Sequence, residues 1–378
     1  MMYLCGCVDT SVVLLLQSNR EPVVFYLDVD SFEARPSSVY STRENHTSSD
    51  WNVEYGEAAL NHRIRSMTQD VLLLFDNTAW EHHDHPAFSY LGTRTCSSEV
   101  QDVIWRMRIV KDAYELRCMI KAARIASQAL AMAYALLHST NGDKFTEVEL
   151  SNAIHAMSRR NGSDGMSFPP IVAFGDAVFT LHHSPSDERT VAGSSRKNGQ
   201  MPQVVIDIGP SFRWYASDFS ESIWVANDTN DAWESVDRIV RACLILMLKT
   251  CVSGKSLGEV NLVARNFMRH QVKTVLAEGM HITDSDVDDC MAHQFMHWIG
   301  LDVHDVDSRM NSMEHYVLVP GMTLAVEPAL YFPPTSVTWQ HSKYAGIGVR
   351  VERTVAVAQE AIPAVELDSD NAFARLGL

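Results

Sequence analysis

Four acidic residues and one histidine in the second half of the chain are the side chains that a pair of divalent metal ions prefers. Carboxylate oxygens with a single imidazole nitrogen suit paired Mn²⁺, Co²⁺ or Zn²⁺ better than a structural zinc bound by thiolates. Two such ions, about 3.5–4 Å apart, can share and activate one water molecule for hydrolysis. The five candidate ligands are Asp207, Asp218, His297, Glu327 and Glu352.

The length and charge of the chain narrow its class. Its 378 residues exceed the roughly 250–300 residues that one hydrophobic core usually serves, so two domains are expected. The composition, 46% hydrophobic and 21% charged, is that of an ordinary soluble globular protein. The net charge of −16 argues against a nucleic-acid partner, because phosphate binding needs clustered lysine and arginine.

The cysteines and the apolar segments predict a reduced, cytoplasmic protein. The seven cysteines are scattered, and none of them form pairs with zinc-ribbon spacing. Such a set is typical of free thiols in a reducing compartment. The most apolar early run, residues 11–16, is too short to span a bilayer, and no basic segment precedes it. We therefore expect no membrane span and no signal peptide.

The pattern of apolar residues predicts a mixed α/β (α+β) fold in two domains, residues 1–108 and 109–378. In the first domain, polar residues 31–56 are expected to form a loop between strands. In the second, Thr146 with Glu149 and Ser256 with Glu259 have the spacing of a capping box, which marks the start of a helix. The expected strands of the first domain are 11–17, 22–29 and 70–75. The expected helices of the second are 112–137, 146 to about 157, 232–252 and 256–280. Its expected strands are 203–209, 221–226, 322–332 and 348–357.

The surroundings of the acidic residues support a metal site. Asp207 ends a predicted strand, and its spacing to Asp218 suits the return strand of a hairpin. Two facing carboxylates repel each other strongly unless a cation lies between them. Glu352 is expected in the middle of a valine-rich strand, where an acid is costly to bury unless it is paired or metal-bound. Arg350 would share its face and pair with Glu352 or Asp218, although an ordinary solvent-facing Arg–Glu pair is the alternative.

Three histidines lie close together in the sequence, at His293, His297 and His304. On a helix the first two would share one face. Gly300 and the alternating residues after it favour a loop that enters a strand instead. Because the chain has 16 histidines, unrelated core and surface rings are the alternative interpretation.

In order along the chain, these motifs resemble the metallopeptidase family with the pita-bread fold. The resemblance is strongest to the Xaa-Pro aminopeptidases (aminopeptidase P), and the Xaa-Pro dipeptidases (prolidases) come next. It runs from about residue 110 to 357 and is looser over the first domain. It implies a creatinase-like amino-terminal domain, shortened at its start, and a pita-bread domain with a curved, mainly antiparallel sheet covered by helices. Its most specific pieces are HWIGLDVHDV (297–306), PGMTLAVEP (320–328) and GIGVRVE (346–352).

Carried over by position, the resemblance implies a role for each ligand. Asp207 would bind one ion with both oxygens, and His297 would bind the other. Asp218 and Glu352 would bridge the two ions, which are expected to be Mn²⁺, with Co²⁺ or Zn²⁺ as alternatives. Glu327 would bind an ion and move a proton while a bridging hydroxide attacks the peptide bond.

The resemblance also implies four residues around the ions. His182 would lie near the scissile bond. His293 and His304 would shape the site for proline and stabilise the tetrahedral intermediate. Arg350 would orient Asp218 from behind.

Together these features predict a metal-dependent Xaa-Pro aminopeptidase that takes peptides with proline at the second position. The short segment between His304 and Glu327, and Trp298 after the ligand histidine, favour it over a dipeptidase. The alternatives are an Xaa-Pro dipeptidase, a metal-free binding protein of the same fold, and a metal-free hydrolase of small amidines. Retention of all five ligands argues against the last two. A homodimer or tetramer is expected from the resemblance.

Two positions depart from the family pattern. Glu221 and Ser222 stand where arginine and threonine are usual, and Glu221 is expected to add negative charge near the ligands. Ala329 replaces a glycine, so the turn there must avoid a positive φ. The histidine-rich tract 81–85 (EHHDH) lies outside the matching region and is predicted to be a solvated loop, with a second metal site as the alternative.

Overall fold

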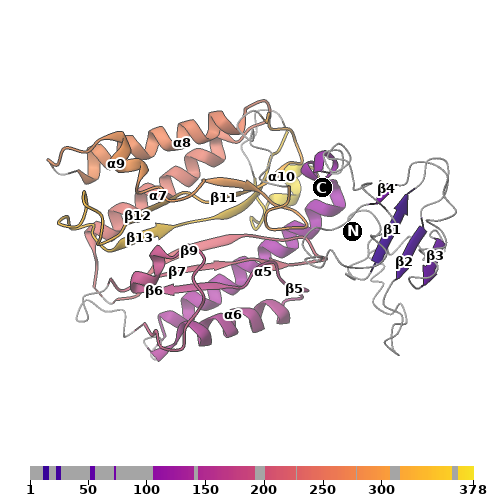
Figure 1. Cartoon of the computed structure of the whole chain (residues 1–378), viewed down its shortest axis with the longest axis horizontal. Helices are drawn as coiled ribbons and strands as arrows, with labels where there is room; N and C mark the ends of the chain where they lie inside the picture. Colours follow the sequence, from indigo (N-terminus) through magenta and orange to yellow (C-terminus); the bar gives the residue numbers. More distant parts are fainter. Residues whose placement is uncertain are drawn as a thin grey trace, which may run out of the picture. The chain divides into compact units, whose positions relative to one another are not determined.

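The computed structural model divides the chain into two compact units, Met1–Arg108 and Ile109–Leu378 (Figure 1). In the first unit it describes the backbone of four strands and, in full, residues 105–108. In the second it describes residues 109–139, 144–191, 201–226, 228–277, 279–306, 316–359 and 365–378. The histidine-rich tract 81–85 lies outside the described residues.

The strands of the first unit form one sheet in the order β3-β2-β1-β4. β1 runs antiparallel to β2 and β4, whereas β2 and β3 are parallel. The prediction of a loop over 31–56 was wrong at β3. That strand lies at an edge of the described sheet, where a polar sequence such as NVEY is tolerated. The bounds are Val12–Leu16 for β1, Val23–Tyr26 for β2, Asn52–Tyr55 for β3 and Leu72–Leu73 for β4.

The four predicted helices of the second unit are present. Thr146 and Glu149 form a capping box at the start of α6, and Ser256 and Glu259 form another at the start of α8. These local hydrogen bonds explain why the helix starts could be read from the sequence. The helices are α5 (Ala113–Leu137), α6 (Glu147–Arg160), α7 (Asp231–Thr250) and α8 (Leu257–Gln271), and α8 continues into a π-helical turn, Val272–Leu276. Two shorter helices are α9 (Asp284–Asp288) and α10 (Ala372–Leu376).

The first sheet of this unit has the order β6-β7-β9, with all pairs antiparallel. β7 and β9 make the predicted hairpin-like pair, but β9 begins at Phe219, earlier than expected. Helices α5 and α6 lie against this sheet (Figure 1). The strands are β6 (Ile171–Phe174), β7 (Gln203–Ile208) and β9 (Phe219–Trp224), and a separate small pair is β5 (Gly165–Met166) with β8 (Pro210–Ser211).

The later strands form two further sheets, β10-β11-β14-β15 and β12-β13, and α7 packs against them. The predicted strands 322–332 and 348–357 are each broken in two. The chain leaves one sheet and joins the other at Glu327-Pro328 and again at Val351-Glu352. Glu352 is therefore at a break and not in the middle of a strand. The bounds are β10 (Met296–Trp298), β11 (Thr323–Val326), β12 (Ala329–Phe332), β13 (Ile347–Arg350), β14 (Arg353–Ala356) and β15 (Val365–Glu366).

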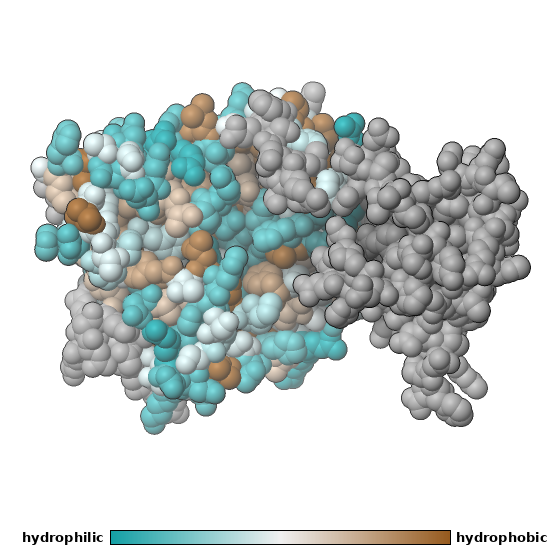
Figure 2. All heavy atoms as spheres, viewed as in Figure 1, coloured by the Kyte–Doolittle hydropathy of each residue, from teal (hydrophilic) through white to brown (hydrophobic). Residues whose placement is uncertain are grey.

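The second unit is thus a set of mainly antiparallel strands with helices packed against them, as the fold class predicted (Figure 1). Strand β7 is buried along its whole length, which anchors Asp207 in the core. The coloured face in Figure 2 is mostly hydrophilic, with apolar residues scattered singly or in small groups. None of the helices in the described ranges is long and apolar enough to cross a bilayer.

Candidate metal centre

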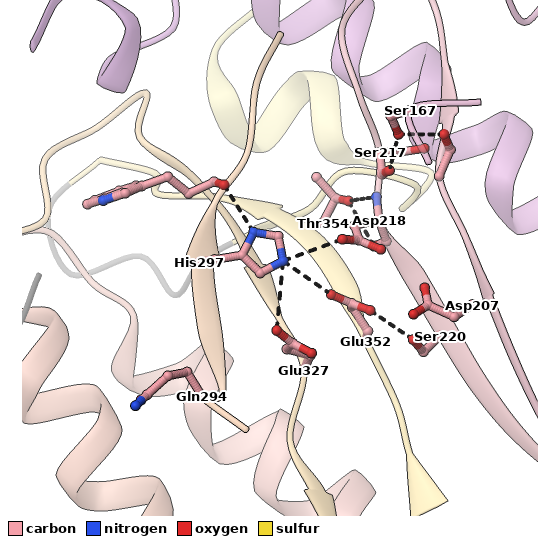
Figure 3. Close-up of polar contacts among 12 residues, drawn as sticks. Ser167, Asp207, Ser217, Asp218, Ser220, Gln294, His297, Glu327, Glu352 and Thr354 are labelled. Atoms are coloured by element: carbon pink, nitrogen blue, oxygen red, sulfur yellow. Dashed lines mark hydrogen bonds and ion pairs between the residues drawn. The ribbon is translucent and has the colours of Figure 1, made fainter. Parts of the chain in front are cut away.

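The five predicted ligands come from five places in the second unit and form one cluster, in which His297 faces three of the carboxylates and Asp207 lies to one side, near Ser220 (Figure 3). Asp207 lies in β7, and Asp218 immediately precedes β9. His297 lies in β10, which follows the loop that carries His293. The predicted strand after Gly300 was wrong, because residues 301–304 form bends that are closed by backbone hydrogen bonds from Gly300 to Asp302 and from Asp305 to Trp298. Glu327 and Glu352 lie at the two strand breaks. Antiparallel pairing of β7 with β9 and of β10 with β11 brings the residues together.

His297 is at the centre of the cluster. Its Nε2 atom lies 3.4 Å from Asp218 Oδ2, 3.7 Å from Glu327 Oε1 and 3.8 Å from Glu352 Oε1. One ligand atom from each of Asp218, His297 and Glu352 lies within 4.8 Å of the other two. The Nδ1 atom of His297 lies 3.0 Å from the carbonyl oxygen of Trp298. If Nδ1 carries the proton and donates it there, Nε2 keeps a lone pair for a metal.

Two carboxylate oxygens in the cluster have no hydrogen-bond donor among the described residues. They are Asp207 Oδ1 and Asp218 Oδ1, and both are buried. A buried acceptor without a partner costs free energy, about 1–3 kcal/mol. Divalent cations would satisfy both oxygens and would relieve the repulsion among four neighbouring carboxylates. The residues therefore fit a site for hard divalent ions.

The pKa values of the carboxyl groups report the same crowding. Burial raises the pKa of Asp207 to about 6, although the Arg350 charge opposes the shift. Burial and the charge of Glu352 raise the pKa of Asp218 and that of Glu327 well above their usual values. Burial also disfavours ionisation of Glu352, but its contacts with His297 and the Arg350 charge outweigh burial and lower its pKa. Without cations, the cluster holds protons that ionised ligands would have to release.

Arg350 contacts the cluster from outside, but the prediction that its carboxylate partner is Glu352 or Asp218 was wrong. Its Nη2 atom donates to Asp207 Oδ2 at 2.7 Å, and it makes no hydrogen bond to the carboxylate of Asp218 or Glu352. Its Nε atom donates to Ser220 Oγ at 3.1 Å, and that hydroxyl donates to Glu352 Oε2 at 2.8 Å. Arg350 thus fixes Asp207 directly and Glu352 through Ser220. The prediction failed because register between distant strands decides which carboxylate Arg350 faces.

Replacing Arg350 with lysine is expected to weaken metal binding about 10- to 100-fold, the usual effect of losing a residue that orients a ligand. A lysine ammonium cannot reach Asp207 and Ser220 with the planar fork of a guanidinium. Titration against a competing chelator would measure the change. Arg269→Lys is the matched control, because Arg269 also makes a paired contact with an aspartate, Asp288, far from the cluster. Unchanged affinity in Arg350→Lys would show that Arg350 does not position the ligands.

The outer histidines occupy different surroundings. His293 Nδ1 lies 3.3 Å from Glu327 Oε2, and its buried Nε2 has no hydrogen-bond partner among the described residues. The His304 ring packs edge-on against His297, with centroids 4.6 Å apart. Partial burial and the charges of His297 and His182 lower the pKa of His304. His182 is exposed in the segment after β6 and is not a member of the cluster. It lies close enough to His304 for its charge to lower the pKa of that ring.

Two residues that support the site were missed at the sequence level. Thr354 Oγ1 accepts a hydrogen bond from the Asp218 amide at 2.7 Å and donates to its carbonyl oxygen at 3.0 Å, which fixes the backbone of that ligand. Glu147 is fully buried at the start of α6 and accepts hydrogen bonds from the backbone amides of Phe174 and Ser186. Its Oε2 atom also lies 2.7 Å from His183 Nε2. Through these hydrogen bonds Glu147 fixes the position of the segment that carries His182. In the sequence it looked like an ordinary acidic residue at a helix start.

Glu147→Gln is expected to lower the free energy of unfolding by about 1–3 kcal/mol, because an amide nitrogen would face a backbone donor in a buried site. The Michaelis constant should rise as well if His182 contacts substrate. Thermal unfolding and steady-state kinetics would measure the two effects. Glu188→Gln is the control, since Glu188 is exposed in the same segment. Equal stability of Glu147→Gln and the wild type would contradict the anchoring role.

The expectation that Glu221 adds charge to the cluster was wrong. Successive side chains of a strand point to opposite faces, so Ser220 faces Glu352 while Glu221 points away. Glu221 instead pairs with Arg241 at 2.9 Å and with Arg353. Ala329 lies in β12, and the non-glycine residues with positive φ in the described chain are Arg213 and Trp214. The turn at Ala329 avoids a positive φ, as expected.

Comparison with known proteins identifies the family of this chain. The model of metallopeptidase family M24 matches residues 117–359. Xaa-Pro aminopeptidase 3 from Rattus norvegicus is 28% identical over 268 residues, which cover 69% of this chain and 49% of that protein. Xaa-Pro aminopeptidase from Escherichia coli (strain K12) is 28% identical over 267 residues, covering 68% and 56%. Xaa-Pro dipeptidase from Pyrococcus horikoshii is 27% identical over 261 residues, covering 69% and 63%. The chain spans about half the length of the first of these relatives.

Solved structures show the same fold. Proline aminopeptidase P II from Yersinia pestis has a TM-score of 0.77 at 21% sequence identity, covering 100% of this chain and 89% of that one. Prolidase from Pyrococcus furiosus has a TM-score of 0.69 at 20% identity, covering 97% and 93%. The prediction of a pita-bread fold is thereby confirmed. Since the family model spans more than half of the chain, including all five clustered residues, this protein belongs to metallopeptidase family M24.

Proposed function

We propose that this protein is a dinuclear-metal Xaa-Pro aminopeptidase, which removes the amino-terminal residue of a peptide whose second residue is proline. The observation that carries the proposal is the cluster of four carboxylates and one imidazole with two buried, unpaired oxygens. Relatives named Xaa-Pro aminopeptidase and Xaa-Pro dipeptidase support the same kind of substrate.

In this proposal the residues that would hold two divalent ions are Asp207, Asp218, His297, Glu327 and Glu352. Mn²⁺ is our choice of ion, because the donor set is hard and rich in oxygen. When bound, the ions supply an activated water and polarise the carbonyl of the scissile bond. Arg350 and Ser220 keep Asp207 and Glu352 in place while the ions bind.

The protein's own residues would then handle protons and substrate. Glu327 belongs to the cluster, with Oε1 3.7 Å from His297 Nε2, and we assign to it the uptake and return of a proton. His293 Nε2 has no partner among the described side chains and would meet the substrate. Burial lowers the pKa of His293 and of His304, which favours the neutral rings near pH 7. The single N–H of a neutral His293 ring is needed at Nδ1, 2.7 Å from the Gln294 carbonyl oxygen, so Nε2 would act as an acceptor. A tertiary Xaa-Pro amide has no N–H, so recognition must use the proline ring and the carbonyl oxygen. His182 is assigned to the outer rim, near the scissile bond.

A comparison of two substrates tests the proposal. The Mn²⁺-loaded protein is expected to cleave an Xaa-Pro-Xaa tripeptide ahead of proline and to act weakly on the Xaa-Pro dipeptide. The tripeptide with alanine in place of proline is the control. Cleavage of the dipeptide alone would instead support the second candidate, an Xaa-Pro dipeptidase, which the Pyrococcus horikoshii relative favours. A purified protein that binds no divalent ions would support a non-peptidase binding protein.

A further inference from the structure

A cavity of about 470 Å³ lies outside the metal centre. Helices α5 and α7, strand β9 and the segment near Asp368 contribute to its walls. Along β9, the Ser220 and Ser222 side chains bond to Glu352 and to the Arg350 backbone. Glu221 between them points to the opposite face and lines the cavity. Phe219 and Ile223, on the same face as Glu221, also line the cavity, and none of the five clustered residues does.

The charged wall of the cavity has an excess of acid. It contains three carboxylates and two guanidinium groups, from Glu221, Asp237, Asp368, Arg241 and Arg353. Arg241 already donates to both Asp237 oxygens and to Glu221, each at 2.9 Å. Arg353 pairs with Glu221 and donates to the Glu352 carbonyl oxygen at 2.7 Å. Asp368 Oδ1, by contrast, is buried and has no donor among the described residues. A positively charged hydrogen-bond donor would therefore satisfy the unpaired Asp368 oxygen.

Aromatic side chains also line the cavity. Tyr134, Trp224 and Trp233 all line the cavity, and the two tryptophan rings lie 5.8 Å apart. Trp233 is only 7% exposed, and its Nε1–H has no acceptor among the described residues. Tyr134 is 54% exposed, and its ring stacks on that of His138 with the centroids 4.1 Å apart. Aromatic faces attract cations, and the Trp233 donor adds a need for one acceptor atom.

We propose that this cavity binds a small primary ammonium compound that has an apolar or aromatic body and one hydrogen-bond acceptor. The ammonium group bonds to Asp368, the acceptor takes the Trp233 Nε1–H, and the body packs on Tyr134 and Trp224. The volume is within the range of about 300–1,000 Å³ that is usual for small-molecule sites. An anion would be repelled by the carboxylates, because the two guanidinium groups are already paired. A purely apolar molecule would leave Asp368 Oδ1 and Trp233 Nε1 unpaired.

Calorimetry on the metal-loaded protein tests the proposal with two probes that cannot be hydrolysed. L-Phenylalaninol has the ammonium, the phenyl ring and a hydroxyl acceptor, whereas 3-phenylpropan-1-ol lacks only the ammonium. We expect L-phenylalaninol to bind at least about tenfold more tightly than the alcohol, as for a charge-assisted hydrogen bond. Asp368→Asn should raise its Kd about tenfold, and Tyr134→Ala about threefold. Asp284→Asn, an exposed change on α9, should leave the Kd unchanged.

The outcomes that overturn the proposal are specific. An unchanged Kd in both Asp368→Asn and Tyr134→Ala would place the bound amine elsewhere, including at the metal centre. Equal affinity for both probes would show that the ammonium group is not recognised. Absence of L-phenylalaninol binding would show that the cavity is not a site for such compounds. Thermal unfolding checks each variant, and Tyr134→Ala, at an exposed position, keeps the test valid if Asp368→Asn is unstable. Peptide hydrolysis is not used as the readout, so failure here is distinct from failure of the proposed peptidase activity.

Discussion

Replacement of Glu352 with alanine is expected to lower kcat/KM for peptide hydrolysis by on the order of 10³-fold, since metal ions supply several kcal/mol and each 1.36 kcal/mol is tenfold in rate. Glu352 is 2% exposed and contacts both His297 and Ser220. Its loss would remove one of the proposed metal ligands and would leave the Ser220 hydroxyl without its acceptor. Both metal content and rate should therefore fall.

Two further variants make this result interpretable. Glu352→Gln keeps the size of the side chain and removes the charge, so a similar loss of metal and rate would identify the charge as the cause. Glu234→Ala, at an exposed acid in the first turn of α7, should leave both quantities unchanged. Elemental analysis and initial rates would be measured on the same samples. A Glu352→Ala protein with full rate and full metal content would refute the assignment of Glu352 as a ligand.

Metal addition is expected to raise the Tm of the metal-stripped protein by about 5–10 °C at pH 7.5, and by clearly less at pH 5. The larger value follows from a gain of about 2.7 kcal/mol at 100 times the Kd and about 2–4 °C per kcal/mol. Ions bind ionised ligands, so protons compete with them as the pH falls. Differential scanning calorimetry at the two pH values, with and without Mn²⁺, would measure the effect.

The sign of the pH effect follows from Asp207. Burial raises its pKa from 3.8 to about 6 in the folded protein, so the folded state binds the extra proton between these values. The stability that this proton contributes is present below about pH 4 and is lost as pH rises through about 6. Above pH 6 the ionised carboxylates of the metal-free cluster therefore repel one another, and bound cations would reduce this repulsion. An equal Tm increase at both pH values, or the same increase in an Asp207→Asn, Asp218→Asn double variant, would contradict this account.

The five residues that cluster could be singled out in the sequence because their order along the chain is distinctive, whereas their role as metal ligands stays a prediction. The starts of α6 and α8 were predictable for a similar reason, since Thr146 with Glu149 and Ser256 with Glu259 make contacts within one helical turn. Local spacing was enough in both cases.

Pairing between distant strands could not be predicted. The breaks at Glu327 and Glu352 arise because the chain changes partner strands, and an apolar run looks the same whether or not it changes. The Asp207 partner of Arg350 depends on the register between β7, β9 and β13. The outward direction of Glu221 depends on which face of β9 meets the cluster. The role of Glu147 depends on Phe174 and Ser186, which come near it only in the folded chain.

The two breaks give Glu327 and Glu352 a mechanical role. Each lies at a joint where the backbone passes from the β10-β11-β14-β15 sheet to the β12-β13 sheet or back. Ions bound by Glu327 and Glu352 would link the two sheets. Movement of one sheet relative to the other would then stretch metal–oxygen bonds. Amide hydrogens in β12 and β14 should then exchange with solvent in concert, and both should slow together when ions bind.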